Sequence, residues 1–235
     1  MPDIRALYED PGLLVVDKPA GLLTIPGRGP DAGPDAQHVL EGQRGERLWV
    51  VHRLDRGTSG ALAFARNPAV HRTLSMAFEH GKVEKRYQAL AFGIVIDDEG
   101  VIDRALVPAR RGKMRPAMPS EGGKPSRTRF RVLERFAAGF TWLELEPETG
   151  RQHQIRVHLG SIGHPLAVDE LYRSASQRTA MELGGQGDEV ILARTPLHCA
   201  HMVLPLGDHS VTVEAPIPDD MARALEILRR PGAGV

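Results

Sequence analysis

The segment from residue 129 to residue 147 most constrains the fold of this chain. It reads RFRVLERF, then AAG, then FTWLELEP, so a short turn with a glycine separates two strand-like runs. Two such runs around a turn of this length are typical of an antiparallel β-hairpin. The chain therefore contains at least one pair of sequence-adjacent antiparallel strands.

Other segments give similar signals. Asn67 is a good helix N-cap, Pro68 suits the first helical position, and Gly81 can end that helix. Strands are expected at 13–16, 61–66, 85–93 and 195–206, helices at 67–81, 150–165 and 219–230, and loops at 26–36 and 173–188. Strands often follow one another through short turns, and no G-x-G-x-x-G follows the first strand. This order predicts an α+β fold with a mixed, mainly antiparallel sheet.

Composition narrows the class of protein. The chain has 235 residues, 41% of them hydrophobic, and a formal net charge of zero. No apolar run reaches the ~20 residues of a membrane-spanning helix, and the N-terminus does not resemble a secretory signal. One cysteine, Cys199, forms no internal disulfide and suits a reducing compartment. We therefore expect a soluble, cytoplasmic protein, with any preference for nucleic acid confined to a local surface.

The stretch VHRLDRGTSG, residues 51–60, holds one carboxylate, Asp55, between Arg53 and Arg56. Such a cluster is more often a surface ion pair than a catalytic site. Here it lies in a glycine-bounded loop ahead of a strand, where reactive groups are often placed. The arginines favour the ionised carboxylate, and Thr58 and Ser59 can hydrogen-bond the loop backbone. Asp55 is therefore the leading catalytic candidate.

Two other chemistries are weaker alternatives. Ser59 lacks the G-x-S-x-G pattern of a serine nucleophile, so we expect it to serve the turn. Histidines are plentiful, and His198, Cys199 and His201 lie close in sequence, but a strand does not make such neighbours converge. The sequence contains neither H-E-x-x-H nor a C-x-x-C pair. We therefore expect no metal site.

A local basic bias points to nucleic acid. Residues 103–131 hold nine lysines or arginines against two acids, Asp103 and Glu121, in an otherwise neutral chain. A solvated loop is the simpler interpretation, but a surface that follows phosphates explains the bias better. Tyr87 stands next to cations in EKRYQAL and can stack on a base, although strand tyrosines usually pack in a core.

Several motifs together resemble one family. HRLDRGTSG is similar to the signature of the RluA-like pseudouridine synthases. Four further segments resemble this family in its own order: DKPAGLLTIPG, EKRYQAL, PETGRQHQIRVHLGSIGHPLAVDELY and RTPLHCAHMVLPL. Together they cover most of residues 12–206, which makes the resemblance highly specific.

The resemblance implies the pseudouridine synthase fold, a mixed, mainly antiparallel sheet with flanking helices and a central cleft. It implies isomerisation of uridine in ribosomal or transfer RNA, with Asp55 as the catalytic residue. It further implies that Tyr87 stacks on the flipped base, that Arg156 pairs with Asp55, and that Leu197 is an apolar pocket residue. Arg53 is expected to help hold the RNA in its flipped state.

A single carboxylate suits this reaction. Hydrolytic glycosidases use two acids, but an isomerase that returns the base to its sugar adds no water. Asp55 can either attack C1′ or remove a proton from the sugar, and both routes need it ionised and shielded from water. No metal or cofactor is required. The alternatives are a hydrolytic glycosidase and an RNA-binding protein without catalytic activity.

The remaining expectations concern organisation. The chain shows no upstream segment like the S4 RNA-binding domain, so we expect one catalytic domain, 1–235. We also expect the protein to be a monomer. RNA is then held by the basic stretch, through Arg110, Arg111, Lys113 and Arg115. Where the family usually has Gly-Asp, this chain has Val168-Asp169, and valine restricts the backbone angles of that turn.

Overall fold

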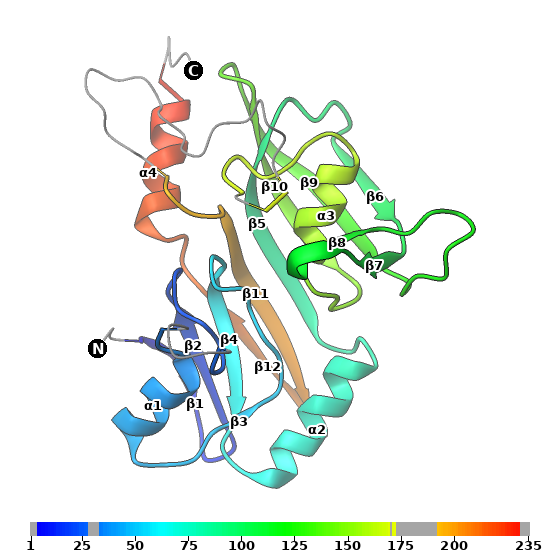
Figure 1. The fold of residues 1–235 in the computed structure, drawn as a ribbon. Helices are drawn as coiled ribbons and strands as arrows, with labels where there is room; N and C mark the ends of the chain where they lie inside the picture. The colour runs from blue at the N-terminus through cyan, green and yellow to red at the C-terminus, as the bar shows by residue number, and fades with distance from the viewer. Residues whose placement is uncertain (1–3, 28–32, 170, 173–191, 231–235) are drawn as a thin grey trace. The chain divides into compact units, whose positions relative to one another are not determined.

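The computed structural model describes residues 4–27, 33–169, 171–172 and 192–230 (Figure 1). The chain divides into two compact units, residues 1–85 with 198–216 and residues 86–197 with 217–235. Each unit combines a sheet with helices, so the predicted α+β class is confirmed. In the described parts of the chain, no helix is both long and apolar enough to span a membrane.

The sheet of the first unit has the order β1-β2-β4-β11, with β3 added to β4 and β12 to β11. The bounds of these strands are β1 Ala6–Glu9, β2 Leu13–Lys18, β3 Trp49–Val50, β4 Ser59–Ala65, β11 Leu197–Leu206 and β12 His209–Glu214. All these pairings are antiparallel except β4 with β11. The first four residues of β2 and residues 61–65 of β4 are completely buried. These two neighbouring strands therefore form the core of the unit.

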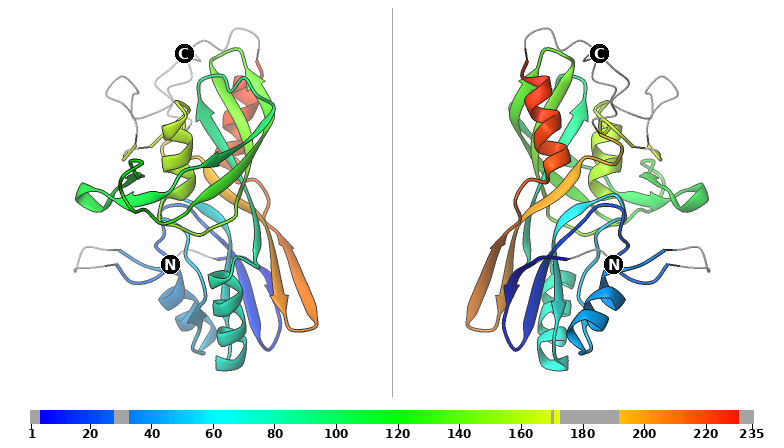
Figure 2. Two further views of the ribbon diagram at one scale, coloured as in Figure 1. Left: turned by 90° about the vertical axis from the view of Figure 1, so that its right-hand side faces the viewer. Right: turned by 90° about the vertical axis from the view of Figure 1, so that its left-hand side faces the viewer.

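Two helices cover the same face of this sheet (Figure 2). Helix α2, Pro68–Glu79, has the predicted start, because the Asn67 side chain accepts the Val70 amide at 2.9 Å. Helix α1, Ala36–Arg44, is absent from the sequence prediction. The predicted loop at 26–36 is therefore wrong at its end: Asp35 caps α1 and Ala36 begins it. Residues 28–32 of that loop lie outside the described residues.

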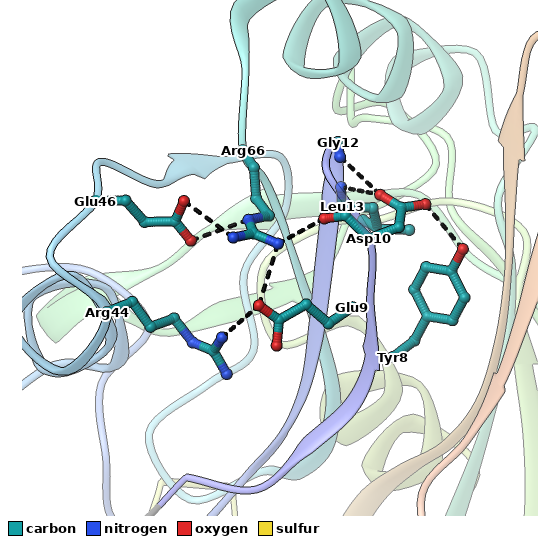
Figure 3. A network of polar contacts seen from close by, with 8 residues as sticks. All are labelled: Tyr8, Glu9, Asp10, Gly12, Leu13, Arg44, Glu46 and Arg66. Atoms are coloured by element: carbon teal, nitrogen blue, oxygen red, sulfur yellow. Dashed lines mark hydrogen bonds and ion pairs between the residues drawn. The ribbon is translucent and has the colours of Figure 1, made fainter.

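The turn between β1 and β2 is built around one carboxylate (Figure 3). Asp10 accepts the amides of Gly12 and Leu13 at 2.7 Å each and the Tyr8 hydroxyl at 2.8 Å. Burial works to raise the pKa of Asp10, but these hydrogen bonds outweigh it and hold the pKa below its usual value. The hairpin is therefore fixed by a carboxylate that stays ionised.

Arg66, at the end of β4, continues this network (Figure 3). Its guanidinium donates to the Asp10 carbonyl at 2.6 Å and pairs with Glu46 at 2.9 Å. Glu9 in turn forms ion pairs with Arg66 at 3.1 Å and with Arg44 at 2.6 Å. The network thus joins the first hairpin to the end of α1 and to β4.

The second unit contains the predicted hairpin. Its strand order is β5-β10-β9-β6, all antiparallel, and β7 and β8 form a separate small hairpin. The bounds are β5 Glu84–Phe92, β6 Glu99–Asp103, β7 Leu106–Pro108, β8 Met114–Pro116, β9 Arg127–Phe136 and β10 Phe140–Pro147. The first two residues of β5 belong to the first unit. The expected hairpin at 129–147 is confirmed as β9 and β10, and the basic stretch 103–131 contains the small hairpin of β7 and β8.

Helix α3 is shorter than predicted. It covers Gln154–Ser161, whereas the sequence predicted a helix over 150–165. His153 has φ of 54°, in the left-handed region, and this conformation prevents the helix from starting earlier. Ile155 and Leu159, four residues apart in the helix, are buried, whereas Ile162 lies just beyond the end of the helix and is only partly buried.

Helix α4, Asp219–Leu228, confirms the predicted terminal helix. It packs into a core formed by Leu90, Phe136, Phe140, Trp142, Val168, Leu192, Met221, Leu225 and Leu228. Val168 is 2% exposed and does not have positive φ. The turn at Val168 therefore does not need glycine, and the valine side chain contributes to the core instead. The predicted loop at 173–188 lies outside the described residues.

Candidate active site

The loop that carries Asp55 is fixed by the segment after β2. The Thr24 hydroxyl donates to the Leu54 carbonyl at 2.9 Å and accepts the Leu54 amide at 3.1 Å. On the other side of Asp55, the Arg56 carbonyl accepts the Gly21 amide at 2.8 Å, and Arg56 Nε donates to the Gly21 carbonyl at 3.0 Å. Both peptide neighbours of Asp55 are therefore held by backbone-directed hydrogen bonds.

A buried lysine also binds the backbone of these segments. Lys18, the last residue of β2, has no exposed surface. Its ammonium donates to the carbonyls of Leu22 at 2.7 Å, Pro19 at 2.9 Å and Arg56 at 3.5 Å. Because three donors meet three carbonyls, the cost of burying the charge is partly offset and the turn after β2 is tied to the Asp55 loop.

His52, three residues before Asp55, ties the loop to strand β4. Strand β4 pairs with β2 along one edge, and its other edge pairs with β11 at residues 59–60 and with β3 at residues 64–65. Between those pairings, His52 Nε2 accepts the Ala63 amide at 2.9 Å. The His52 ring also stacks on Phe78 of α2, with centroids 4.5 Å apart. The His52 side chain thus accepts a β4 amide that a neighbouring strand would otherwise accept.

This histidine is neutral at physiological pH. Burial and, secondly, the charge of Lys85 lower the pKa of His52 to about 3. Burial also lowers the pKa of Lys85, whose ammonium lies 5.9 Å from the Phe78 ring centroid. Because Nε2 of the neutral ring is an acceptor here, the ring proton lies on Nδ1.

Ser59 and His198 form a structural pair. Ser59 Oγ lies 2.9 Å from His198 Nδ1, and His198 Nε2 lies 3.2 Å from the Ala215 carbonyl. A carbonyl only accepts, so Nε2 carries a proton, and in the neutral ring Nδ1 accepts the Ser59 hydroxyl. The expectation that Ser59 serves its own turn is therefore wrong. Both nitrogens of His198 make these contacts.

Arg156 forms a buried ion pair with Asp169. Its Nε and Nη2 donate to the two carboxylate oxygens, each at 2.7 Å, and both residues are buried. Such bidentate pairing fixes the plane of the guanidinium. The pairing of Arg156 with Asp55 that the resemblance implies stays a prediction.

Tyr87 and Leu197 are both buried. Tyr87 lies on β5, opposite Leu145 of β10, and is 9% exposed. Leu197 is 4% exposed at the start of β11, where its amide donates to the Thr195 carbonyl. Both belong to the second unit, together with Arg156, whereas Asp55 and the exposed Arg53 belong to the first. Their roles toward RNA stay predictions.

The basic stretch divides into paired and exposed cations. Arg115 makes two 2.6 Å hydrogen bonds to Glu121, so its charge is largely neutralised by that carboxylate. Arg110 and Arg111 are exposed and Lys113 is partly exposed in the loop between β7 and β8. This basic loop, residues 110–113, is therefore a better candidate than Arg115 to bind phosphates.

Sequence reasoning missed four supporting residues, Lys18, Thr24, His52 and Asp169. Thr24 lies in the quoted DKPAGLLTIPG segment, but its partner Leu54 is 30 residues away. Asp169 follows Arg156 by 13 residues, and no local pattern links them. Lys18 looks like an ordinary strand-end lysine. Only the tertiary structure reveals these four roles.

Comparison with known proteins identifies the family. The sequence profile described as RNA pseudouridylate synthase matches residues 12–161. The chain is 38% identical over 234 residues to the ribosomal large subunit pseudouridine synthase D of Nitrosomonas europaea, covering 96% of this chain and 65% of that protein. It is 37% identical to the uncharacterized RNA pseudouridine synthase YlyB of Bacillus subtilis, covering 98% of this chain and 74% of that protein. The chain thus spans about two thirds to three quarters of these two relatives.

The fold agrees with a solved structure. The human RNA pseudouridylate synthase domain containing 4 superposes with a TM-score of 0.76 at 25% identity, over 96% of this chain and 93% of that chain. The expected pseudouridine synthase fold is therefore confirmed. The matched residues 12–161 include the Asp55 loop, Tyr87 and Arg156. The chain belongs to the RNA pseudouridylate synthase family.

Proposed function

We propose that this protein is an RNA pseudouridine synthase, in which Asp55 starts the isomerisation of a uridine in ribosomal or transfer RNA. The observation that carries the proposal is the support of the Asp55 loop. Thr24 and Gly21 hold the residues on either side of Asp55, and Lys18 holds the Arg56 carbonyl. A catalytic group needs this kind of fixed position, because small misplacements of a reactive group are costly.

The proposed reaction keeps every atom of the uridine except one proton exchanged with solvent. Asp55 either attacks C1′ or removes a proton from the sugar, and the N1–C1′ bond breaks. The uracil turns and C5 bonds to C1′. This step breaks the Asp55–C1′ ester if Asp55 attacked C1′, and Asp55 returns the proton to the sugar if it removed one. N1 gains a proton and the proton on C5 leaves to solvent, so Asp55 ends as the free carboxylate. No water is consumed, so one carboxylate is enough, whereas a hydrolytic glycosidase needs two.

The other predicted residues complete the proposal. The target base must leave its stack, at a cost of a few kcal/mol. Tyr87 stacks on the flipped base, Leu197 provides an apolar wall, and Arg53 helps hold the flipped RNA. Arg156, oriented by Asp169, pairs with Asp55. We further propose that one catalytic domain, a cytoplasmic monomer, performs this reaction, and that Arg110, Arg111, Lys113 and, more weakly, Arg115 bind phosphates.

The test uses the purified protein with RNA that carries tritium at C5 of uridine. Transcripts of large-subunit ribosomal RNA and bulk transfer RNA are incubated separately, and released tritium and free uracil are both measured. A synthase releases tritium without releasing uracil and leaves pseudouridine in the RNA. Free uracil would identify a hydrolase instead. RNA binding without tritium release from either RNA would identify a binding protein.

A further inference from the structure

Tyr172 contacts three parts of the second unit that the proposed function uses separately. Its hydroxyl lies within hydrogen-bond distance of Met114, the first residue of β8, and of His153, the residue before α3. Its ring faces the guanidinium of Arg156. We propose that Tyr172 is a positioning residue that couples the basic loop, residues 110–113, to Arg156. This inference rests on the proposed function, because it assigns the loop to RNA and Arg156 to the reaction.

The hydroxyl end fixes the basic loop. Tyr172 Oη accepts the amide of Met114 at 2.8 Å, and Met114 directly follows Lys113. Oη also lies 2.7 Å from His153 Nδ1. A phenol hydroxyl has one proton, and the Met114 amide already donates to its oxygen, so the hydroxyl can donate that proton to Nδ1 of a neutral His153. The chain leaving the basic loop is thus anchored to the residue that precedes α3.

The ring end orients Arg156. The guanidinium carbon of Arg156 lies 5.0 Å from the centre of the Tyr172 ring, within the range of a cation–π contact. Asp169, which binds Arg156 through both oxygens, also accepts the amides of Leu171 at 3.0 Å and Tyr172 at 3.2 Å. The ring and backbone of Tyr172 therefore belong to the same assembly that fixes Arg156.

The backbone of His153, where Tyr172 contacts the start of α3, is locally strained. It is one of two described non-glycine residues with positive φ, and the other, Arg111, lies in the basic loop. Such conformations cost free energy and persist where surrounding contacts enforce them. His153 has those contacts, since its ring packs edge-on against Tyr172 with centroids 5.5 Å apart. A second link joins the same parts, because Gln152 Nε2 donates to the Gly112 carbonyl at 3.5 Å.

Two substitutions separate the two ends of the side chain. Tyr172→Phe keeps the ring over Arg156 and removes only the hydroxyl. We expect it to weaken RNA binding by about three- to tenfold, the effect of one lost hydrogen bond, and to leave kcat within about twofold. Tyr172→Leu removes the ring as well and is expected to lower kcat in addition. Tyr8→Phe is the matched control, because it removes a tyrosine hydroxyl in the first unit.

A double-mutant cycle tests the coupling itself. The basic loop is neutralised by Arg110→Ala, Arg111→Ala and Lys113→Ala, and Tyr172→Phe is then added. If the hydroxyl acts through the loop, adding Tyr172→Phe to the neutralised loop changes RNA affinity by less than about twofold. Fully additive losses would overturn the proposal.

Amide hydrogen exchange of Met114 gives a readout that does not depend on activity. We expect exchange at Met114 to be faster in Tyr172→Phe than in the wild-type protein, and unchanged in Tyr8→Phe. Unchanged exchange in Tyr172→Phe would overturn the coupling even if the enzyme is active. Absence of pseudouridine formation by the wild-type protein would instead contradict the proposed function, and the exchange result would still decide whether Tyr172 holds the loop.

Discussion

The Thr24 hydroxyl binds both backbone polar groups of Leu54, with its donor bond at 2.9 Å and its acceptor bond at 3.1 Å. Leu54 directly precedes Asp55, so one buried hydroxyl fixes the peptide that carries the proposed catalytic carboxylate. Thr24 is 3% exposed and Leu54 is 6% exposed, so water does not readily replace these bonds.

Thr24→Val removes the hydroxyl and keeps the shape of the side chain. It leaves the amide and carbonyl of Leu54 without this partner, so we expect the free energy of unfolding to fall by about 1–3 kcal/mol. Because the Asp55 loop loses its anchor, we also expect kcat to fall about tenfold or more. Urea denaturation and tritium release measure the two effects. Thr24→Ser is the control and should retain most of both; a valine variant with wild-type kcat would contradict the anchoring role.

Elements with local signals could be predicted from the sequence. The β9–β10 hairpin follows from two strand-like runs around a turn, and α2 follows from its cap at Asn67 and from Pro68 at its first position. Both are decided by residues that are neighbours in sequence. Helix α1 was missed because its cap, Asp35, stands at the end of a stretch rich in proline, glycine and aspartate.

Contacts between distant residues could not be predicted in this way. The Asp55 loop was recognised from its motif, but the residues that hold it, such as Lys18 and Thr24, act through partners 30 or more residues away. The start of α3 was predicted too early because no sequence signal marks the left-handed conformation of His153. That conformation accompanies a tertiary contact with Tyr172.

The neutrality of His52 predicts a specific pH dependence of stability. Its pKa is about 3 in the folded protein, against 6.5 for an unperturbed histidine, so between these values the unfolded chain binds a proton that the folded chain does not. From pH 6.5 downward toward 3, this residue should lower the free energy of unfolding by about 1.4 kcal/mol per pH unit. Above pH 6.5 its contribution is constant.

His52→Gln isolates that contribution. Glutamine offers an acceptor to the Ala63 amide but does not titrate. The free energy of unfolding of the variant should therefore fall less steeply with decreasing pH than that of the wild type. Urea denaturation of both proteins between about pH 4.5 and about pH 7 measures the difference. Identical slopes in the two proteins would show that His52 titrates in the folded protein as it does in the unfolded chain, which contradicts the lowered pKa.

Asp169→Asn tests the buried ion pair that orients Arg156. Removing one charge from a buried pair leaves the other uncompensated, so we expect stability to fall by about 3–5 kcal/mol. We also expect kcat to fall, because the guanidinium loses one partner that sets its plane. Asp208→Asn is the control, since the Asp208 side chain is 99% exposed. An Asp169→Asn protein as stable as this control would contradict the role of the pair.

The central claim is that Asp55 alone supplies the catalytic carboxylate. Asp55→Asn preserves the shape of the side chain and removes its charge, so both proposed routes, attack on C1′ and proton removal, are lost. The most direct measurement compares tritium release and RNA binding of the wild-type and Asp55→Asn proteins on the same labelled RNA. We predict no tritium release above background by the variant and RNA affinity close to that of the wild type. Tritium release by Asp55→Asn at a rate near that of the wild type would contradict the account.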